Sequence, residues 1–332
     1  MRLLAILVAL IILEVIIFLV IFVLPVNPFS KEDVTVLIPK GSSAKEVASI
    51  LKSSGAIRSA LGFRILVKLK KFDTALKSGE YVIKKNMTPN HILKKLVQGD
   101  YIKREVRVIP CTTLKDLSQE IVKAGLGTAN EVETALFDSK LFAKYSIPYP
   151  SLEGYSLPDT YYFTRPISVL EIIDFLVGHL FQRLESAGIQ EKAKRVNFTI
   201  HEVLTLASII EAEAKDPFER PLISSVYHNR LKRGMPLQAD PTVAYGLKKL
   251  GQPLSYQDLA TPNPYNTYLI TGLPPSPICF PSFESIQSAV EPLETNYLYF
   301  VADGTGRHKF SVSFDEHLKN VQLFRKSSQN HK

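Results

Sequence analysis

The sequence of 332 residues predicts an α+β protein with an apolar N-terminal helix, a small α+β module and a larger mixed α+β domain that ends in a β-hairpin. Three observations predict this class. The chain opens with a long apolar run, a strand-then-helix pattern recurs three times after it, and two alternating segments lie near the end. The expected parts are a membrane anchor, a linker, the small module, the larger domain and a polar tail, at residues 1–25, 26–33, 34–100, 101–326 and 327–332.

The N-terminal run is apolar from Leu3 to Leu24. About 22 residues are enough to span a bilayer as a helix. No A-x-A-like cleavage site follows, and Pro25 ends the run, so we expect an uncleaved anchor. Arg2 favours a cytoplasmic start, which would place the remainder outside the cytoplasmic membrane in a single-pass topology. Glu14 lies within the span, where it is protonated, paired with a partner helix or simply tolerated by its apolar surroundings.

Three strand–helix units recur along the chain. The first two make up the small module, and the third begins the larger domain. VTVLIP precedes KGSSAKEVASILKSSG, YVIKKN precedes MTPNHILKKLVQG, and VRVIP precedes CTTLKDLSQEIVKAG. Each helical segment begins near a Ser or Thr suited to an N-cap and ends near glycine. SALGFRILVKLKKF, between the first two units, predicts a further helix.

The larger domain mixes helices with long ordered loops. EIIDFLVGHLFQRLESAG and HEVLTLASIIEAEA read as helices, whereas residues 234–281 are rich in Pro, Gly, Asn and Tyr. Such loops commonly carry function on a rigid scaffold. NYLYFVAD and KFSVSF, joined by GTGRH, predict the β-hairpin, and the chain after Lys326 is expected to be loose.

Composition and missing motifs exclude several classes of protein. The net charge of +8 suits an anionic partner, but the lysines are scattered without interleaved aromatic residues, so nucleic acid is not expected. No dinucleotide fingerprint, phosphate loop or nucleophile elbow occurs. His201-Glu202 begins like a zinc helix, but position 205 is Thr, so neither metal nor cofactor is expected. Cys111 and Cys279 have no metal spacing and are either unpaired apolar residues or one long-range disulfide.

The helical segment 203–214 carries two carboxylates, Glu211 and Glu213. At 100° per residue they fall on opposite flanks of the apolar face, so periodicity alone does not choose between them. A glutamate with apolar neighbours can have the raised pKa that an acid catalyst needs. The alternative is the polar edge of an ordinary surface helix. For Arg220 and Arg230 we expect no more than pairing with nearby acids.

At ASIIEAEA, SVYHNRL, GMPLQADPTVAYGL and TPNPYNTYLITGLPPSPI the chain resembles the YceG-like family, the endolytic murein transglycosylases called MltG. SLEGYSLPDTYYF and NYLYFVADGTGRHKFS resemble the family's upstream and C-terminal motifs, so the resemblance covers nearly the whole chain. Two departures are Ala239, in place of the usual Ser or Thr, and VIPCTT, where the family often has Glu-Gly after the proline.

The resemblance implies a membrane-anchored lyase acting on peptidoglycan glycan strands. Family members cleave the β-1,4 bond between N-acetylmuramic acid and N-acetylglucosamine in nascent strands, leave 1,6-anhydro ends and so terminate elongation. The catalytic glutamate by this match is Glu211, acting as acid and then as base, with Glu213 in an auxiliary position. The 34–100 module would be LysM-like and bind glycan. Peptidoglycan synthases of the elongation or division machinery are further expected partners.

The glycan cleft is expected to use polar and aromatic loop residues together with Glu213, namely Gln238, Asp240, Asn266 and Tyr268. Asp240 could instead cap a helix before Pro241, and Asn266 and Tyr268 could instead lock their loop. Two other functions stay open. One is a hydrolytic muramidase on the same scaffold, in which Asp240 activates water, and the other is a non-catalytic cell-wall-binding scaffold.

Overall fold

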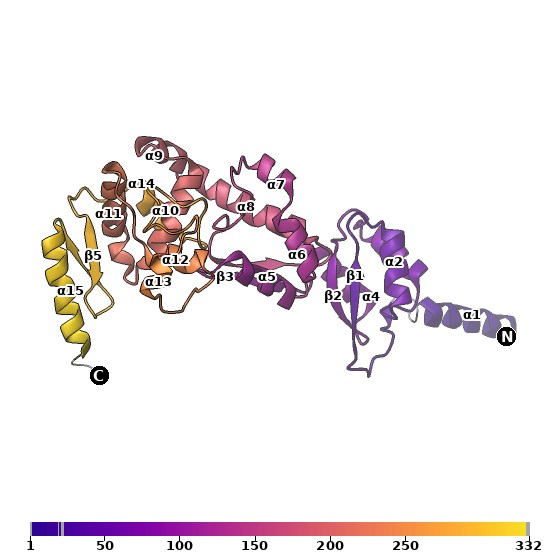
Figure 1. Cartoon of the computed structure of the whole chain (residues 1–332). Helices are drawn as coiled ribbons and strands as arrows, with labels where there is room; N and C mark the ends of the chain where they lie inside the picture. Colours follow the sequence, from indigo (N-terminus) through magenta and orange to yellow (C-terminus); the bar gives the residue numbers. More distant parts are fainter. Residues whose placement is uncertain (1, 19, 21–22, 330–332) are drawn as a thin grey trace. The chain divides into compact units, whose positions relative to one another are not determined.

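The computed structural model describes residues 2–18, 20 and 23–329 (Figure 1). The chain divides into two compact units. The first comprises the chain up to Glu105 together with Tyr162–Ser168, and the second comprises Val106–Tyr161 and the chain from Val169 onward. Helices and two-stranded sheets occur together in the described chain, which confirms the predicted mixed α+β class.

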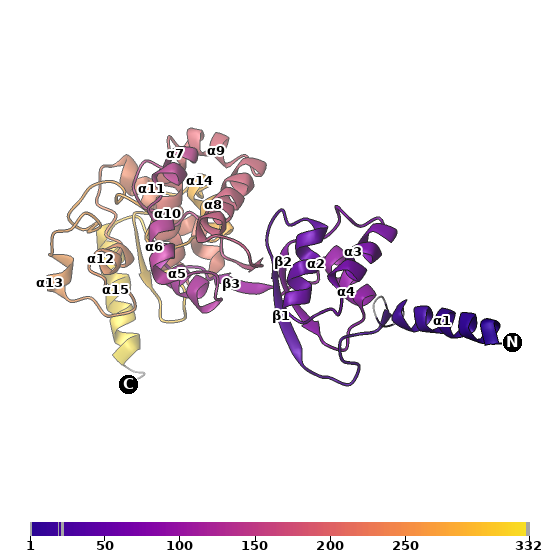
Figure 2. The ribbon, with the colours of Figure 1, turned by 90° about the vertical axis from the view of Figure 1, so that its right-hand side faces the viewer.

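The first unit is a two-stranded ribbon covered by three helices. Its strands β1 and β2 are antiparallel, with Val36 opposite Tyr81. Figure 2 shows α2, α3 and α4 beside this ribbon, and their apolar faces form one core with it. The elements are α1 (Arg2–Phe18), β1 (Asp33–Ile38), α2 (Ala44–Ser53), α3 (Ala60–Leu69), β2 (Gly79–Lys84) and α4 (Pro89–Gln98), followed by β3 (Arg104–Val108).

The helix punctuation read from the sequence is present in this unit. Ser43 and Glu46 form a capping box at the start of α2, and the Thr88 hydroxyl accepts a hydrogen bond from the backbone at the start of α4. Gly99 ends α4 in the left-handed conformation, which glycine adopts without a Cβ clash. These local signals placed the two helices correctly.

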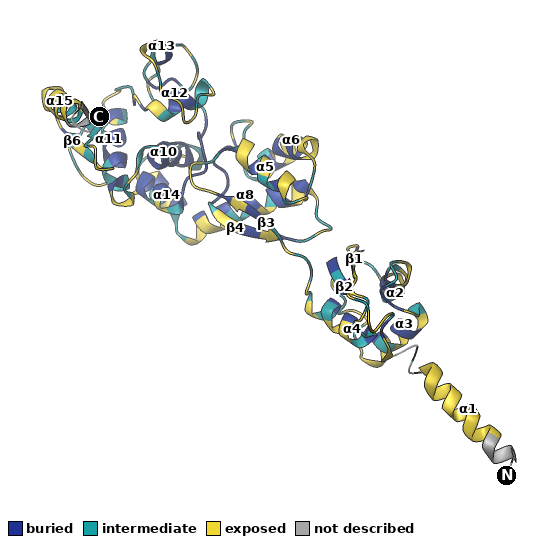
Figure 3. Cartoon of the chain, turned by 90° about the horizontal axis from the view of Figure 1, so that it is seen from below, coloured by how far each residue is buried: buried dark blue, intermediate teal, exposed yellow. Residues whose placement is uncertain are grey.

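The second unit is built around α10, whose residues from Val203 to Glu211 are all buried. Figure 3 shows α10 in the colour of buried residues. The helices α11 and α14 pack against it. The elements are α5 (Leu114–Lys123), α6 (Ala129–Leu136), α7 (Ser139–Lys144), β4 (Asp159–Phe163, paired with β3), α8 (Val169–Ser186), α9 (Ile189–Arg195), α10 (Ile200–Glu213), the 3₁₀ helix η2 (Pro217–Glu219), α11 (Arg220–Lys232), α12 (Asp240–Gly246), α13 (Tyr256–Leu259), α14 (Phe283–Val290), β5 (Tyr299–Ala302), β6 (His308–Ser311) and α15 (Phe314–Gln329).

The C-terminal hairpin is confirmed, with β5 antiparallel to β6 and Phe300 opposite Phe310. A helix that we did not predict follows it. The ring of Tyr299 on β5 stacks on that of His317 on α15, with centroids 5.2 Å apart. The helix α15 reaches Gln329, so residues 327–329 of the predicted tail are helical, and the rest of the tail lies outside the described residues.

The predicted membrane span falls on α1 and the residues after it. Among the described residues, no helix meets the length and apolarity needed to cross a bilayer. The helix α1 runs for 17 residues from Arg2 to Phe18, and residues 19, 21 and 22 of the predicted span lie outside the described chain.

Candidate active site

The two glutamates of α10 have different surroundings although they are two residues apart. Thr199 and Glu202 form a capping box at the start of this helix, which ends at Glu213. Glu211 is buried against α11 and α14, whereas Glu213 is half-buried and lines a cleft. The helical spacing that placed them on opposite flanks therefore separates them into two environments.

The cleft has a volume of about 260 Å³. Its walls come from the end of α10, from α11, from the loop before α12, from the loop after α13 and from the hairpin. The residues that matter for its chemistry are Glu213, Gln238, Asp240, Tyr268, Phe300 and His308. Four of the six predicted site residues thus meet here, and Glu211 and Asn266 are not among the lining residues.

Glu213 carries a strongly shifted carboxyl group in this cleft. Its pKa is raised to about 7, chiefly by burial and also by the nearby Asp240 carboxylate, while a hydrogen bond from Tyr227 opposes the shift. The Tyr227 hydroxyl donates to Glu213 Oε1 at 3.2 Å. A pKa raised toward neutrality makes both the protonated and the ionised form of Glu213 accessible, which suits a group that must give up a proton and take one back.

Asp240 and Tyr268 form a polar pair in the cleft. The Tyr268 hydroxyl donates to Asp240 Oδ1 at 2.6 Å. The N-cap of α12 is Ala239, and Asp240 is the first helical residue, so the Asp240 side chain does not cap this helix. Its carboxylate faces the cleft instead.

Arg230 holds the cleft walls together through backbone carbonyl groups. Its Nη1 donates to Pro236 O at 3.1 Å and to Leu237 O at 2.9 Å, and its Nε donates to Leu298 O at 2.7 Å. Nη1 also donates to the Gln238 side-chain oxygen at 3.1 Å. The expectation that Arg230 pairs with an acid is wrong, because Arg230 donates to carbonyl oxygens of the loop that follows α11 and of the segment that leads into the hairpin.

Glu211 occupies a site of fixed hydrogen bonds. Its Oε2 accepts from Ser282 N at 3.0 Å, from the Ser282 hydroxyl and from the Ser285 hydroxyl at 2.6 Å, and its Oε1 accepts from Arg220 Nη2 at 3.2 Å. Burial alone would raise the pKa of Glu211, but the serine hydrogen bonds and Arg220 hold it below its ordinary value. The expected raised pKa is therefore wrong, because the apolar neighbours are outweighed by donors from α11 and α14 that the helix pattern does not show.

Asn266 lies inside its loop and not in the cleft. It has no exposed surface, and its Nδ2 donates to Leu259 O at 3.0 Å and Thr261 O at 2.8 Å. Its Oδ1 accepts from Tyr268 N at 3.0 Å. These contacts are those of a loop-locking residue, and they place the neighbouring Tyr268 where its ring can reach the cleft.

Two cleft residues that we did not single out come from the hairpin. Phe300 packs edge-on against Tyr227 with ring centroids 5.9 Å apart. His308 is hydrogen-bonded through Nδ1 to Glu219 Oε2 at 2.7 Å. Strand alternation predicts that Phe300 faces one side of the hairpin, but the sequence does not indicate that this side closes over α10.

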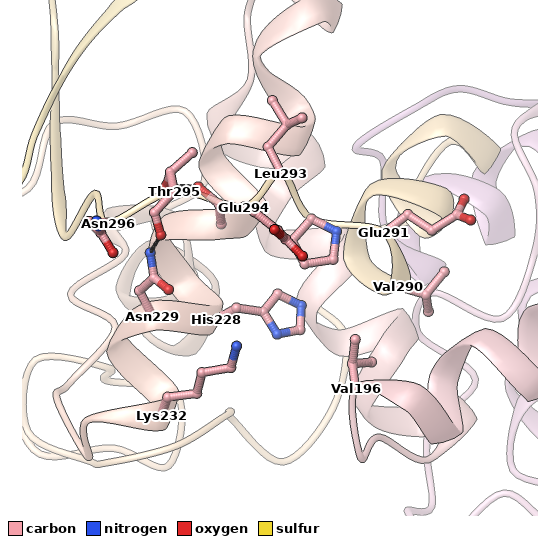
Figure 4. Close-up of a pocket in the computed structure, with 12 residues that line it drawn as sticks. Val196, His228, Asn229, Lys232, Val290, Glu291, Leu293, Glu294, Thr295 and Asn296 are labelled. Carbon is pink, nitrogen blue, oxygen red and sulfur yellow. Dashed lines mark hydrogen bonds between the residues drawn. The ribbon is translucent and has the colours of Figure 1, made fainter.

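A second pocket, of about 660 Å³, lies between α11 and the chain after α14 (Figure 4). None of the predicted site residues lines it. Figure 4 shows Asn229 directed at Thr295, and Asn229 Nδ2 donates to Thr295 O at 2.9 Å. His228 Nε2 bonds Ala289 O at 2.8 Å. Because these polar groups hold the chain around the pocket, we place the candidate active site at the Glu213 cleft.

Comparisons with known proteins agree in one family. A model of the YceG-like family matches residues 36–323. The endolytic murein transglycosylase of Bacillus subtilis (strain 168) is 34% identical over 316 residues, which cover 90% of this chain and 87% of the relative. That of Streptococcus pneumoniae (strain D39) is 33% identical over 330 residues, and the match spans 59% of its length. A 2.6 Å crystal structure of a yceG-like protein from Listeria monocytogenes matches with a TM-score of 0.59 and 34% identity, covering 87% of this chain and 99% of that one.

Proposed function

Since the chain belongs to the YceG-like family, we propose that it is a lytic transglycosylase of peptidoglycan, a lyase that acts within glycan strands. The bond cut is the β-1,4 bond between N-acetylmuramic acid and N-acetylglucosamine. The observation that carries the proposal is a glutamate with a pKa of about 7 in a cleft lined by amide, carboxylate and aromatic side chains. The names of the relatives support the same activity.

In this mechanism Glu213 transfers the proton in both directions. Protonated Glu213 donates to the glycosidic oxygen as the bond to C1 breaks. The C6 hydroxyl of the muramic acid then bonds to C1, and the ionised carboxylate takes its proton, which regenerates the acid and leaves a 1,6-anhydro end. Acid–base catalysis of this kind contributes roughly 10²–10⁴-fold. A second carboxylate is not needed as nucleophile, because the attacking oxygen belongs to the substrate.

We assign this role to Glu213, whereas the family resemblance implied Glu211, and the two variants described below distinguish these untested assignments. The contacts favour Glu213 for two reasons. Four hydrogen bonds occupy the Glu211 carboxylate and favour its ionised form. Glu213 lines the cleft and accepts one hydrogen bond, from Tyr227, so that it can meet a substrate oxygen.

The remaining cleft residues bind the glycan in this proposal. Gln238 and Asp240 supply hydrogen-bonding groups, and the ring of Tyr268 supplies a flat apolar face for a sugar ring. Arg230 is a positioning residue, because it orients the Gln238 side chain and fixes the loop that carries Asp240.

The anchor and the small module complete the proposal. Apolar side chains of α1 from Ile6 to Phe18 are exposed around the helix (Figure 3). A helix that is apolar all round is stable when lipid or protein covers it, so we assign residues 3–24 to the cytoplasmic membrane and the catalytic domain to the extracytoplasmic side.

The 34–100 module has its own apolar core and would bind glycan in a LysM-like manner. Termination of nascent strands would bring the enzyme next to peptidoglycan synthases.

The test is mass spectrometry of muropeptides released from purified sacculi by the full chain in detergent. Wild-type protein should release 1,6-anhydro ends, Glu213→Gln should release almost none while folding normally, and folded Glu211→Gln should retain release. Reducing ends instead of anhydro ends would indicate a hydrolytic muramidase. Binding without any release by the wild type would indicate a non-catalytic scaffold. Near-wild-type release by Glu213→Gln would exclude Glu213 from proton transfer.

A further inference from the structure

The thiols of Cys111 and Cys279 are neighbours although the two residues are 168 positions apart in the chain. Their Sγ atoms lie 3.3 Å apart. Two backbone hydrogen bonds fix the segments that carry them, from Cys111 N to Phe280 O at 3.0 Å and from Phe280 N to Thr112 O at 2.8 Å. Both cysteines belong to the second unit, so this proximity is a property of one compact body.

The backbone of Cys111 is unusual for a cysteine. Its φ is 61°, in the left-handed region that glycine adopts freely and that a side chain with a Cβ disfavours. The residue is also exposed, so its side chain does not fill the core. A non-glycine residue in such a conformation is commonly retained for a function. For an exposed cysteine whose sulfur meets a second sulfur, the function indicated is thiol chemistry.

We propose that Cys111 and Cys279 form a reversible intramolecular disulfide, with a dithiol–disulfide exchange partner or a small-molecule disulfide as the oxidant. One thiolate attacks the oxidant's disulfide and releases one of its sulfurs as a thiol. The second cysteine then attacks this mixed disulfide, forms the Sγ–Sγ bond and releases the other sulfur. The pair loses two electrons and two protons, and the oxidant gains them. The bond length of about 2.05 Å requires the sulfurs to approach by roughly 1.2 Å.

The two thiols differ in solvent exposure and in pKa, and these differences suit the order of steps proposed above. Cys111 is exposed, and a hydrogen bond from the Cys279 thiol lowers its pKa. Cys279 is 2% exposed, and its hydrogen bond to Cys111 together with burial raises its pKa. The thiolate is the attacking species, so Cys111 meets the oxidant first and Cys279 resolves the mixed disulfide.

The disulfide would join the start of the second unit to the segment that positions Glu211. Cys279 lies three residues before Ser282, which donates to the Glu211 carboxylate and caps α14. On the other side of the link, Thr113, two residues after Cys111, is the N-cap of α5. Cross-linking residues this distant in sequence restricts the unfolded chain and stabilises the folded one, so oxidation should raise the Tm.

The test uses the full chain in detergent, equilibrated with a large excess of oxidised over reduced glutathione and then alkylated. Peptide mapping without reduction should show one peptide pair joined through Cys111 and Cys279, lighter than the two free peptides by two hydrogens. Oxidised wild type should melt several degrees above reduced wild type, and Cys279→Ser should show no such rise.

The single variants test the order of the steps. Cys279→Ser should accumulate a mixed disulfide with glutathione at Cys111, whereas Cys111→Ser should keep Cys279 as a free thiol. The proposal is overturned if oxidised wild type keeps both thiols free or carries glutathione on Cys111 without the internal link. Faster glutathione addition at Cys279 than at Cys111 would overturn the assigned order.

Discussion

The Tyr227 hydroxyl on α11 donates a hydrogen bond to Glu213 Oε1 at the end of α10, at 3.2 Å. This bond favours the ionised carboxylate, whereas burial and the charge of Asp240 favour the protonated acid. The pKa of about 7 is the balance of these opposing effects. Changing either neighbour should therefore move the pKa of Glu213 in a known direction.

We expect kcat/KM for release of anhydro-muropeptides to fall as the pH rises through about 7, because the acid that starts the reaction is lost. Tyr227→Phe removes a bond to the ionised form, so this decline should move to higher pH. Asp240→Asn removes a negative charge that raises the pKa of Glu213, so the decline in kcat/KM should move to lower pH. The measurement is the full pH profile of kcat/KM for the three proteins.

Tyr256→Phe is the matched control for these profiles, because Tyr256 is exposed at 87% and does not line the cleft. Its profile should coincide with that of the wild type. A common decline in all four proteins would show that another group sets the pH dependence.

Glu211→Gln should reduce stability more than it reduces the chemical step. The substitution removes a buried anion that faces Arg220 and two serine side chains. Breaking such a buried pair costs about 3 kcal/mol, which corresponds to a Tm lower by roughly 6–12 °C for a domain of this size. Thermal unfolding followed by circular dichroism measures it.

The pH dependence of this loss has a defined sign. The folded-state pKa of Glu211 is below its ordinary value, so its stabilisation is present above the unfolded pKa and is lost as the pH falls through the folded pKa. The difference in Tm between wild type and Glu211→Gln should therefore become smaller at acidic pH. Glu202→Gln, in the capping box at the other end of α10, is the control and should stay within about 0.5 kcal/mol of the wild type, because Gln also forms this box. Equal losses for the two variants would contradict the structural role of Glu211.

Asn266→Ala should destabilise the protein by about 2–3 kcal/mol, because Leu259 O, Thr261 O and Tyr268 N lose their partner in a buried loop. The exposed Asn130→Ala is the matched control and should stay within ~0.5 kcal/mol of the wild type. Denaturant unfolding measures both. If Asn266 instead contacts glycan, its variant will keep wild-type stability and raise KM.

The full chain should fractionate with membranes, and a variant lacking residues 1–25 should be released from them. The exposed apolar side chains of α1 give the physical reason. The truncated protein should still release anhydro-muropeptides, since the cleft lies wholly in the second unit. Recovery of the full chain in the soluble fraction would contradict the anchor.

Local sequence patterns determined most of the secondary structure. Apolar periodicity and capping residues such as Ser43 and Thr88 placed helices, because these signals act within one turn of the chain. Alternation and a glycine-containing turn placed the hairpin. Successive residues of an α-helix are rotated by about 100°. The spacing of Glu211 and Glu213 in the sequence was therefore enough to place their side chains on different flanks of α10.

Tertiary structure decided what each flank meets. Glu211 is held by Ser282 and Ser285, and Glu213 shares its cleft with hairpin residues more than 80 positions away, such as Phe300. The pKa of a carboxyl group depends on burial and on charges and donors within a few ångströms, and periodicity carries no information about groups so distant in sequence. The sulfurs of Cys111 and Cys279 meet for the same reason. Their contact depends on how the chain between them folds, which no local pattern encodes.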